Sequence, residues 1–199
     1  LAFLSIAGVF SVHGLMTPGH LMHEVFATLP ASAWISVAVG SIFAALSAVE
    51  MPKRVEAFVQ RAGTAIFAWT AVALGTYIFL SFVMTEWLEW TPTDNRQVQY
   101  AIAFGSFALY AYATVRYAQA YVFARLPSQA AAAAALALLC QVPPIILWGQ
   151  VWHLSWWIYH ALYLAAFVVL FAGWAIEAHR AGSLKAIADG LSMRDALAQ

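Results

Sequence analysis

The chain has 199 residues, of which 64% are hydrophobic and only 9% are charged. Soluble globular domains are typically ~45–50% apolar and ~25% charged, so these few charged side chains cannot cover a water-soluble fold of this size. The net charge is zero and no cluster of basic residues exceeds the pair Lys53-Arg54, which excludes a basic nucleic-acid-binding surface. Cys140 is the single cysteine, which excludes a disulfide framework. The composition therefore indicates a membrane protein.

The charge-free stretches have room for six membrane-spanning helices of about 20 residues each. The expected spans run from Leu1 to about Met16, from about Ala31 to Val49, between Arg61 and Glu86, between Arg96 and Arg116, and as two spans between Arg125 and Glu177. Pro143-Pro144 and Gly149 divide the last stretch, because proline and glycine interrupt helices. We predict an all-α, polytopic transmembrane helix bundle over residues 1–178 and a cytoplasmic exit helix over residues 179–199.

Two local patterns in the fifth span have alternative interpretations. The run from Ala130 to Ala135 is typical of a small-residue surface that lets helices approach closely, and equally of a lipid-facing helix start. Gln141 with Pro143-Pro144 predicts either a cavity in the fifth helix or a simple kink.

Basic residues and aromatic residues separate to opposite faces of the predicted bundle. Eight of the nine basic residues fall in the second-to-third loop, the fourth-to-fifth loop or the C-terminal tail, and only Arg96 falls on the other face. That other face carries four acidic residues, Glu24, Glu86, Glu89 and Asp94, and six of the nine Trp, namely Trp87, Trp90, Trp148, Trp152, Trp156 and Trp157. The positive-inside rule then predicts a cytoplasmic C-terminus and an outer aromatic belt.

Five of the six histidines fall near the predicted outer face: His13, His20, His23, His153 and His160. His13 lies about one turn inside the end of the first span. His153 and His160 are two helical turns apart, about 10.5 Å along one helix face. The antiparallel arrangement of the first and sixth spans gives His13 and His160 a similar depth.

An ionisable residue at membrane depth is a functional hypothesis by default, and neutral imidazole is the commonest transition-metal ligand. Two histidines from neighbouring helices can supply both axial ligands of a b-type haem. Three histidines, His13, His153 and His160, can alternatively hold Zn²⁺ or Cu, with His20 as a further ligand. Met16 and Met22 are soft supplementary ligands if the ion is Cu(I). The other interpretation is that these histidines form interhelical hydrogen bonds. His179 beside Arg180 is expected to be a cytoplasmic flank.

Two segments resemble a known family. The segment Phe10-Ser-Val-His13-Gly-Leu-Met-Thr17-Pro18-Gly19 resembles the signature His-Ala-Leu-x-Thr-Pro-Gly, and Trp152-His153-Leu-Ser155-Trp156-Trp157-Ile-Tyr-His160 resembles Trp-His-x-Ser-Trp-Trp-x-x-His. Both signatures occur in the multi-span input domain that precedes class III adenylate/guanylate cyclases and other output modules of bacterial sensors. The resemblance implies that His13, His153 and His160 match the histidines of the family, whereas His20 departs from its pattern.

The resemblance also implies a place in the bacterial inner membrane, a further span before Leu1, an output domain in the same polypeptide and a homodimer. We expect the chain to begin within a longer protein, because Leu1 is already apolar. The first hypothesis is thus a membrane-embedded sensor that binds haem b or a transition metal ion (Cu or Zn) and relays a signal to a cytoplasmic output module. No catalytic motif of a cyclase is present in the segment itself.

Three other function classes compete with the sensor. A b-type electron-transfer cytochrome would be favoured by histidines in the inner half of the spans, which are absent from the sequence. A zinc-dependent intramembrane hydrolase would need a carboxylate as general base, for which Glu24 is the one candidate. A transporter has the least support, because no predicted span carries an internal charge and no inverted repeat is evident.

Overall fold

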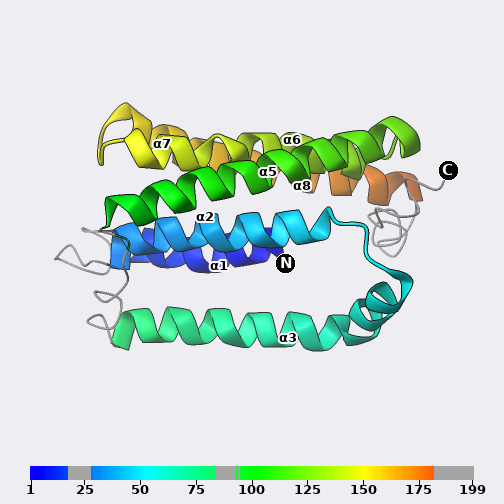
Figure 1. Ribbon diagram of the computed structural model, residues 1–199, viewed down its shortest axis with the longest axis horizontal. Coiled ribbons are helices and arrows are strands. Elements are labelled where there is room, and N and C mark those ends of the chain that lie inside the picture. The colour runs from blue at the N-terminus through cyan, green and yellow to red at the C-terminus, as the bar shows by residue number, and fades with distance from the viewer. Residues whose placement is uncertain (18–27, 84–92, 94, 182–199) are drawn as a thin grey trace. The chain divides into compact units, whose positions relative to one another are not determined.

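The computed structural model describes residues 1–17, 28–83, 93 and 95–181 (Figure 1). The helices are α1 (Ala2–Leu15), α2 (Thr28–Ser47), α3 (Lys53–Val83), α5 (Arg96–Ala124), α6 (Pro127–Cys140), α7 (Val142–Trp148) and α8 (Leu154–Ala181). Strands are absent from the described residues. The prediction of an all-α chain is confirmed.

Five helical stretches are long and apolar enough to cross a membrane, and α6 and α7 together make one of them. A helix spans the ~30 Å hydrocarbon core with about 20 residues at 1.5 Å per residue. The remaining predicted span, at the start of the chain, corresponds to α1, an apolar helix of only 14 residues.

Two helices extend well beyond the predicted spans. α3 begins at Lys53, before Arg61, and α5 continues past Arg116 to Ala124. The charge-free stretches mark the apolar part of a helix rather than its ends, because Lys, Arg, Glu and Gln are good helix formers. The charged turns continue the same helices beyond their most apolar part.

The fifth and sixth spans are separated at Gly149 and not at the prolines. α6 ends at Cys140, and after Gln141 the chain continues as α7, with Pro143 and Pro144 in its first turn. Proline is tolerated there because the first N–H groups of a helix have no intrahelical acceptor. The helix is thus interrupted at Gln141, just before the two prolines.

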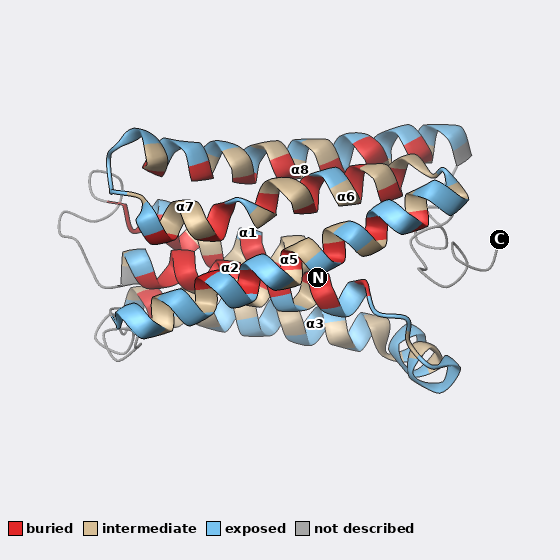
Figure 2. Ribbon diagram, turned by 45° about the horizontal axis from the view of Figure 1, so that its top comes forward, coloured by how far each residue is buried: buried red, intermediate tan, exposed pale blue. Residues whose placement is uncertain are grey.

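The chain folds into two compact units. The first unit comprises residues 1–43 and 52–103, and the second comprises residues 44–51 and the described residues from 104 onward. In the first unit α1 packs against α3. A Cβ atom added at Gly8 would lie 2.9 Å from the side chain of Leu74, so glycine permits this close helix contact. The rest of α3 is largely exposed (Figure 2).

In the second unit α8 packs along α6 and α7. Ala131, Ala132 and Ala135 are buried on α6. A Cβ atom added at Gly173 would lie only 2.1 Å from the Cβ of Ala131. The alanine run therefore provides the close helix approach that was one of its two interpretations, and the contact depends on small residues on both helices.

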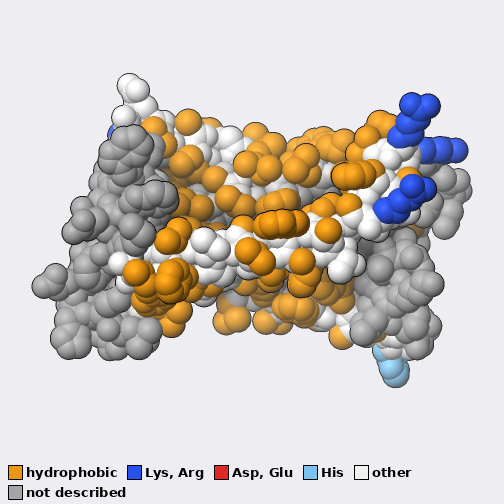
Figure 3. Space-filling model, turned by 90° about the horizontal axis from the view of Figure 1, so that it is seen from below, with side chains coloured by type: hydrophobic (Ala, Val, Ile, Leu, Met, Phe, Trp, Pro, Cys, Tyr) orange, Lys and Arg blue, Asp and Glu red, His pale blue; other side chains and the backbone are white. Residues whose placement is uncertain are grey.

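Large apolar side chains cover much of the outer surface. On the face shown in Figure 3, hydrophobic side chains cover the middle, and Lys and Arg gather at one end. Trp69 on α3 and Leu164 on α8 are among the most exposed residues, at 75% and 67%. Soluble monomers rarely expose such extensive apolar surface, and helices that face lipid do. The fold is thus compatible with a membrane protein.

Candidate histidine site

His13 is buried in the last turn of α1, where two contacts hold its ring and one holds its backbone. Its Nδ1 atom lies 2.8 Å from the carbonyl oxygen of Leu29, near the start of α2. Its ring stacks on Phe10 with the centroids 4.9 Å apart. The hydroxyl of Thr17 donates a hydrogen bond to the backbone carbonyl of His13 at 2.8 Å. The local sequence therefore fixes both the position and the orientation of this imidazole.

His160 lies in the second turn of α8 and is half-buried between aromatic rings. Its Nδ1 atom lies 2.7 Å from the carbonyl oxygen of Trp156, one turn earlier. The ring centroids of Trp156 and Tyr159 lie 4.1 Å and 4.2 Å from that of His160. These neighbours restrict rotation of the imidazole.

Both histidines adopt the same tautomer. A carbonyl oxygen can only accept a hydrogen bond, so Nδ1 carries the proton in each neutral ring. The lone pair is then on Nε2. Metal-ligating histidines very commonly donate their other ring N–H in this way, and the bond orients the ring and raises the basicity of the ligating nitrogen. Each of the two imidazoles is therefore oriented in the way that is common for a metal-ligating histidine.

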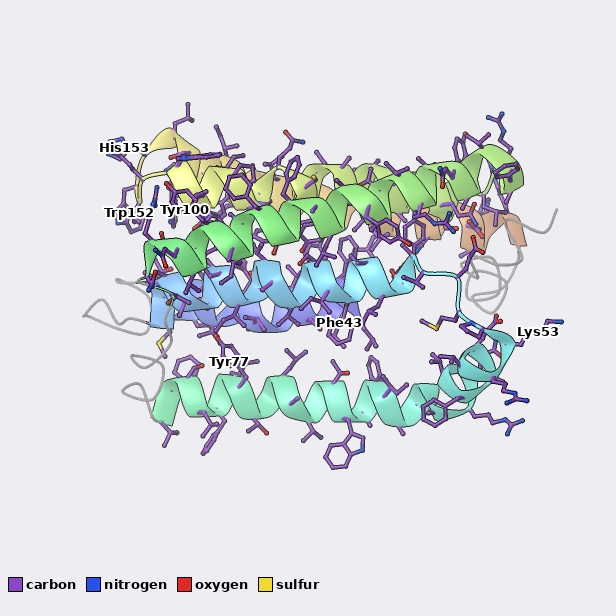
Figure 4. All side chains as sticks on the ribbon, viewed as in Figure 1. Phe43, Lys53, Tyr77, Tyr100, Trp152 and His153 are labelled. Carbon is purple, nitrogen blue, oxygen red and sulfur yellow. The ribbon has the colours of Figure 1, made fainter. Side chains whose placement is uncertain are left out.

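His153 has a different environment. It precedes α8, which begins at Leu154, so His153 and His160 do not lie on one continuous helix face as the sequence pattern predicted. Its side chain is exposed beside Trp152, whose φ angle is 64° (Figure 4). The carbonyl of His153 accepts a hydrogen bond from the N–H of Trp156 at 3.0 Å, so its backbone shapes the first turn of α8.

The other predicted ligands are divided between the described and undescribed parts of the chain. Met16 is fully buried at the end of α1. His20, Met22, His23 and Glu24 lie outside the described residues. His13 and Met16 belong to the first unit, and His153 and His160 to the second. Within the part of the chain that the structure describes, no three residues among His, Cys, Asp and Glu are grouped to hold a metal ion.

Sequence reasoning treated Glu177 as a span boundary and missed its contact. Glu177 is only 5% exposed, and its Oε2 atom accepts a hydrogen bond of 2.8 Å from the N–H of Ser128. Ser128 is in the first turn of α6, where N–H groups lack intrahelical partners. The one available signal is Glu177 itself, because it ends the longest charge-free stretch of the chain.

The contact of Glu177 does not by itself offset its burial. A carboxylate at a helix N-terminus gains roughly 0.3–1 kcal/mol and at most ~2 kcal/mol, whereas burying an ionised group costs several kcal/mol. Among the described residues no cation forms an ion pair with Glu177. Stability alone therefore does not explain a carboxylate at this position.

No protein-family model, curated protein or solved structure matches the chain.

Proposed function

We propose that the chain is a membrane-embedded sensory domain in which His13 and His160 bind haem or a transition metal ion through Nε2. One observation carries the proposal: both histidines direct Nδ1 to a backbone carbonyl, which leaves the lone pair on Nε2. Each of them is restrained by aromatic contacts within an apolar helix.

The proposed ligand is haem b, or a Cu or Zn ion. His153 is the third ligand in the metal-ion form, because its exposed ring is not held by packing and can turn toward a ligand. Met16 and His20 are supplementary donors that suit Cu(I), for which thioether sulfur is a soft ligand. When bound, the group would supply a redox or coordination change that serves as the signal.

The proposed topology has six spans, with α1 as the first, and a cytoplasmic C-terminus in the bacterial inner membrane. Charge and aromatic residues within the second unit support this orientation. Arg125 precedes α6 and Arg180 lies in the last turn of α8, whose end meets the start of α6. Trp148 and Trp152 lie at the opposite end. The positive-inside rule assigns the arginine end to the cytoplasm.

We further propose that α8 relays the signal to an output domain in the same polypeptide, and that the protein acts as a homodimer. The resemblance of the two histidine segments to input domains of cyclases supports this role. α8 is continuous from its His160 end to Ala181, so a shift at the histidine reaches the end of the helix.

Absorbance spectroscopy and elemental analysis of the detergent-purified chain test the ligand. We expect either a Soret band or stoichiometric Cu or Zn, lost in His13→Ala and in His160→Ala. His179→Ala is the matched control and should retain the ligand, because His179 is exposed in the last turn of α8. A chain purified from ligand-supplemented cells with neither haem nor metal would refute the proposal.

A further inference from the structure

α8 is held at both of its ends by the hairpin that it forms with α6 and α7. At the end near α7, the N–H of Gln150 donates to the hydroxyl of Ser155 at 3.0 Å. A Cβ atom at Gly149 would lie 3.1 Å from the Oγ atom and 3.2 Å from the Cβ atom of Ser155, so the backbone before α8 packs closely against its first turn. At the other end, the buried Glu177 carboxylate accepts a hydrogen bond of 2.8 Å from the N–H of Ser128.

The two ends of α8 differ in how they are held. The turn before Ser155 is fixed by close packing of the backbone, whereas the Glu177 end is fixed by one hydrogen bond to a carboxylate that has no ion-pair partner among the described residues. His179 and Arg180, which follow Glu177 within one turn, are exposed. Water is therefore close to Glu177, and release of the carboxylate exchanges one hydrogen bond for hydration.

The contact between Gly173 and Ala131 lies about one turn from Glu177 and leaves no space for a sliding movement. A carbonyl oxygen of Pro127 would also lie 3.1 Å from a Cβ atom at Gly173. If the end of α8 moves, it must therefore pivot about the contact between Gly173 and Ala131. Such a pivot separates Glu177 from Ser128 and leaves the packed part of the hairpin intact.

We propose that the hydrogen bond between Glu177 and Ser128 is a catch that holds the C-terminal end of α8, and that its release is the step that passes a signal to the chain beyond Ala181. His160 and Glu177 are 17 residues apart on one continuous helix, about 25 Å along its axis. The assignment of the signal to the histidine end rests on the proposed function. The catch itself rests only on contacts within the hairpin.

Spin labels on α6 and α8 test the catch by double electron–electron resonance. Ala134 and Ile176 are exposed and belong to the same hairpin, so Ala134→Cys and Ile176→Cys carry the labels in a Cys140→Ser background. The complete chain is measured in lipid nanodiscs without added haem or metal. We expect one narrow distance distribution in this parent, and a shifted or broadened one in Glu177→Ala.

Two further variants separate the catch from a general loss of structure. Ser128→Pro removes the N–H donor. It places two prolines in the first turn of α6, and α7 already has two prolines, Pro143 and Pro144, in its first turn. It should shift the distribution as Glu177→Ala does, and the double variant should add nothing. Glu177→Gln keeps an acceptor oxygen and should retain the narrow distribution.

Each outcome bears on one of the two proposals. Unchanged distributions in Glu177→Ala and Ser128→Pro would overturn the catch, as would release in Glu177→Gln. In the second arm haem, Cu or Zn is added to the parent, and a shift toward the distribution of Glu177→Ala is expected. A shift in the variants without any response to haem or metal would leave the catch standing and would reject haem or metal as the signal that releases it, while ligand binding itself is decided by absorbance and elemental analysis.

Discussion

His13 and His160 share a hydrogen-bonding pattern although their surroundings differ. His13 is buried and bonded to the start of the following helix, whereas His160 is half-buried and bonded within its own helix. In each case the carbonyl acceptor fixes the proton on Nδ1. The sequence pattern could identify both residues as intramembrane histidines, but it could not determine their tautomer, because the acceptors belong to the folded backbone.

Glycine is required at residue 173, where α8 packs against α6, but not at the open position 105 of α5. Gly173→Ala should lower the free energy of unfolding by about 1–3 kcal/mol, because the added methyl group overlaps the Cβ of Ala131 and forces the helices apart. Denaturant titration in detergent micelles, followed by tryptophan fluorescence, measures the change.

Gly105→Ala is the matched control for this substitution. Nothing lies within 4 Å of a Cβ atom at Gly105 on α5, so alanine should stabilise this helix by roughly 0.5–1 kcal/mol. Equal effects of the two substitutions would contradict the close packing of α6 on α8.

Two side chains of α5 hold the end of α2 and the loop that follows it. Arg116 on α5 donates from Nε to the carbonyl oxygen of Ala48 at 3.4 Å and forms an ion pair with Glu50. The next residue, Tyr117, donates its hydroxyl hydrogen to Ser47 at 3.2 Å. One turn of α5 thus fastens the end of α2 and the loop that follows it.

Loss of the Arg116 contacts should affect the local unfolding of the loop after α2 more than the stability of the whole protein. Arg116→Ala should increase hydrogen exchange over residues 48–51, because Arg116 contacts two residues of that loop. The free energy of unfolding should change by no more than about 1 kcal/mol, since partly exposed ion pairs contribute ~0–1 kcal/mol. Hydrogen-exchange mass spectrometry in nanodiscs measures the loop.

Arg125→Ala serves as the comparison for Arg116→Ala. It removes the same charge, but the guanidinium of Arg125 lies over the ring of Tyr121, 5.6 Å from its centroid. Exchange over residues 48–51 should stay at the parent rate. If both variants increased exchange there equally, net charge rather than the specific contacts would control the loop.

At the scale of the whole molecule, the second unit has a basic end and an aromatic end. Trp152 and Trp157 are more than half exposed near the start of α8, where indole rings suit the membrane interface. The arginines lie at the other end of the same helices. This asymmetry is what the proposed orientation depends on.

Thiol labelling of intact cells tests the orientation. In a Cys140→Ser background, His153→Cys should react with a membrane-impermeant maleimide added outside spheroplasts, whereas Arg125→Cys should react only after permeabilisation. Both positions are exposed in the structure, so burial does not mask either thiol. The reverse labelling pattern would invert the proposed topology.

The fold class and two of the candidate site residues could be predicted from the sequence alone. Scarce charge and long apolar stretches predict a helical membrane protein, because hydrocarbon requires each backbone N–H and C=O group to be satisfied within its own segment. Sequence reasoning also singled out His13 and His160. The charge-free stretches did not indicate that α3 begins at Lys53 or that α5 continues to Ala124. The sequence pattern also placed His153 within a helix that begins one residue later. Helix ends are difficult to predict because the local balance between helix propensity and capping sets them.

Only the tertiary structure decided which residues touch. The shared Nδ1 hydrogen bonds, the contact between Gly173 and Ala131, and the burial of Glu177 against Ser128 each join groups that come from different turns or different helices. Mean hydropathy measures how apolar a segment is, but the pairing of two helix faces depends on the shapes and hydrogen bonds of both partners together. Composition therefore predicted a helical membrane protein, and packing determined how α8 is held against α6.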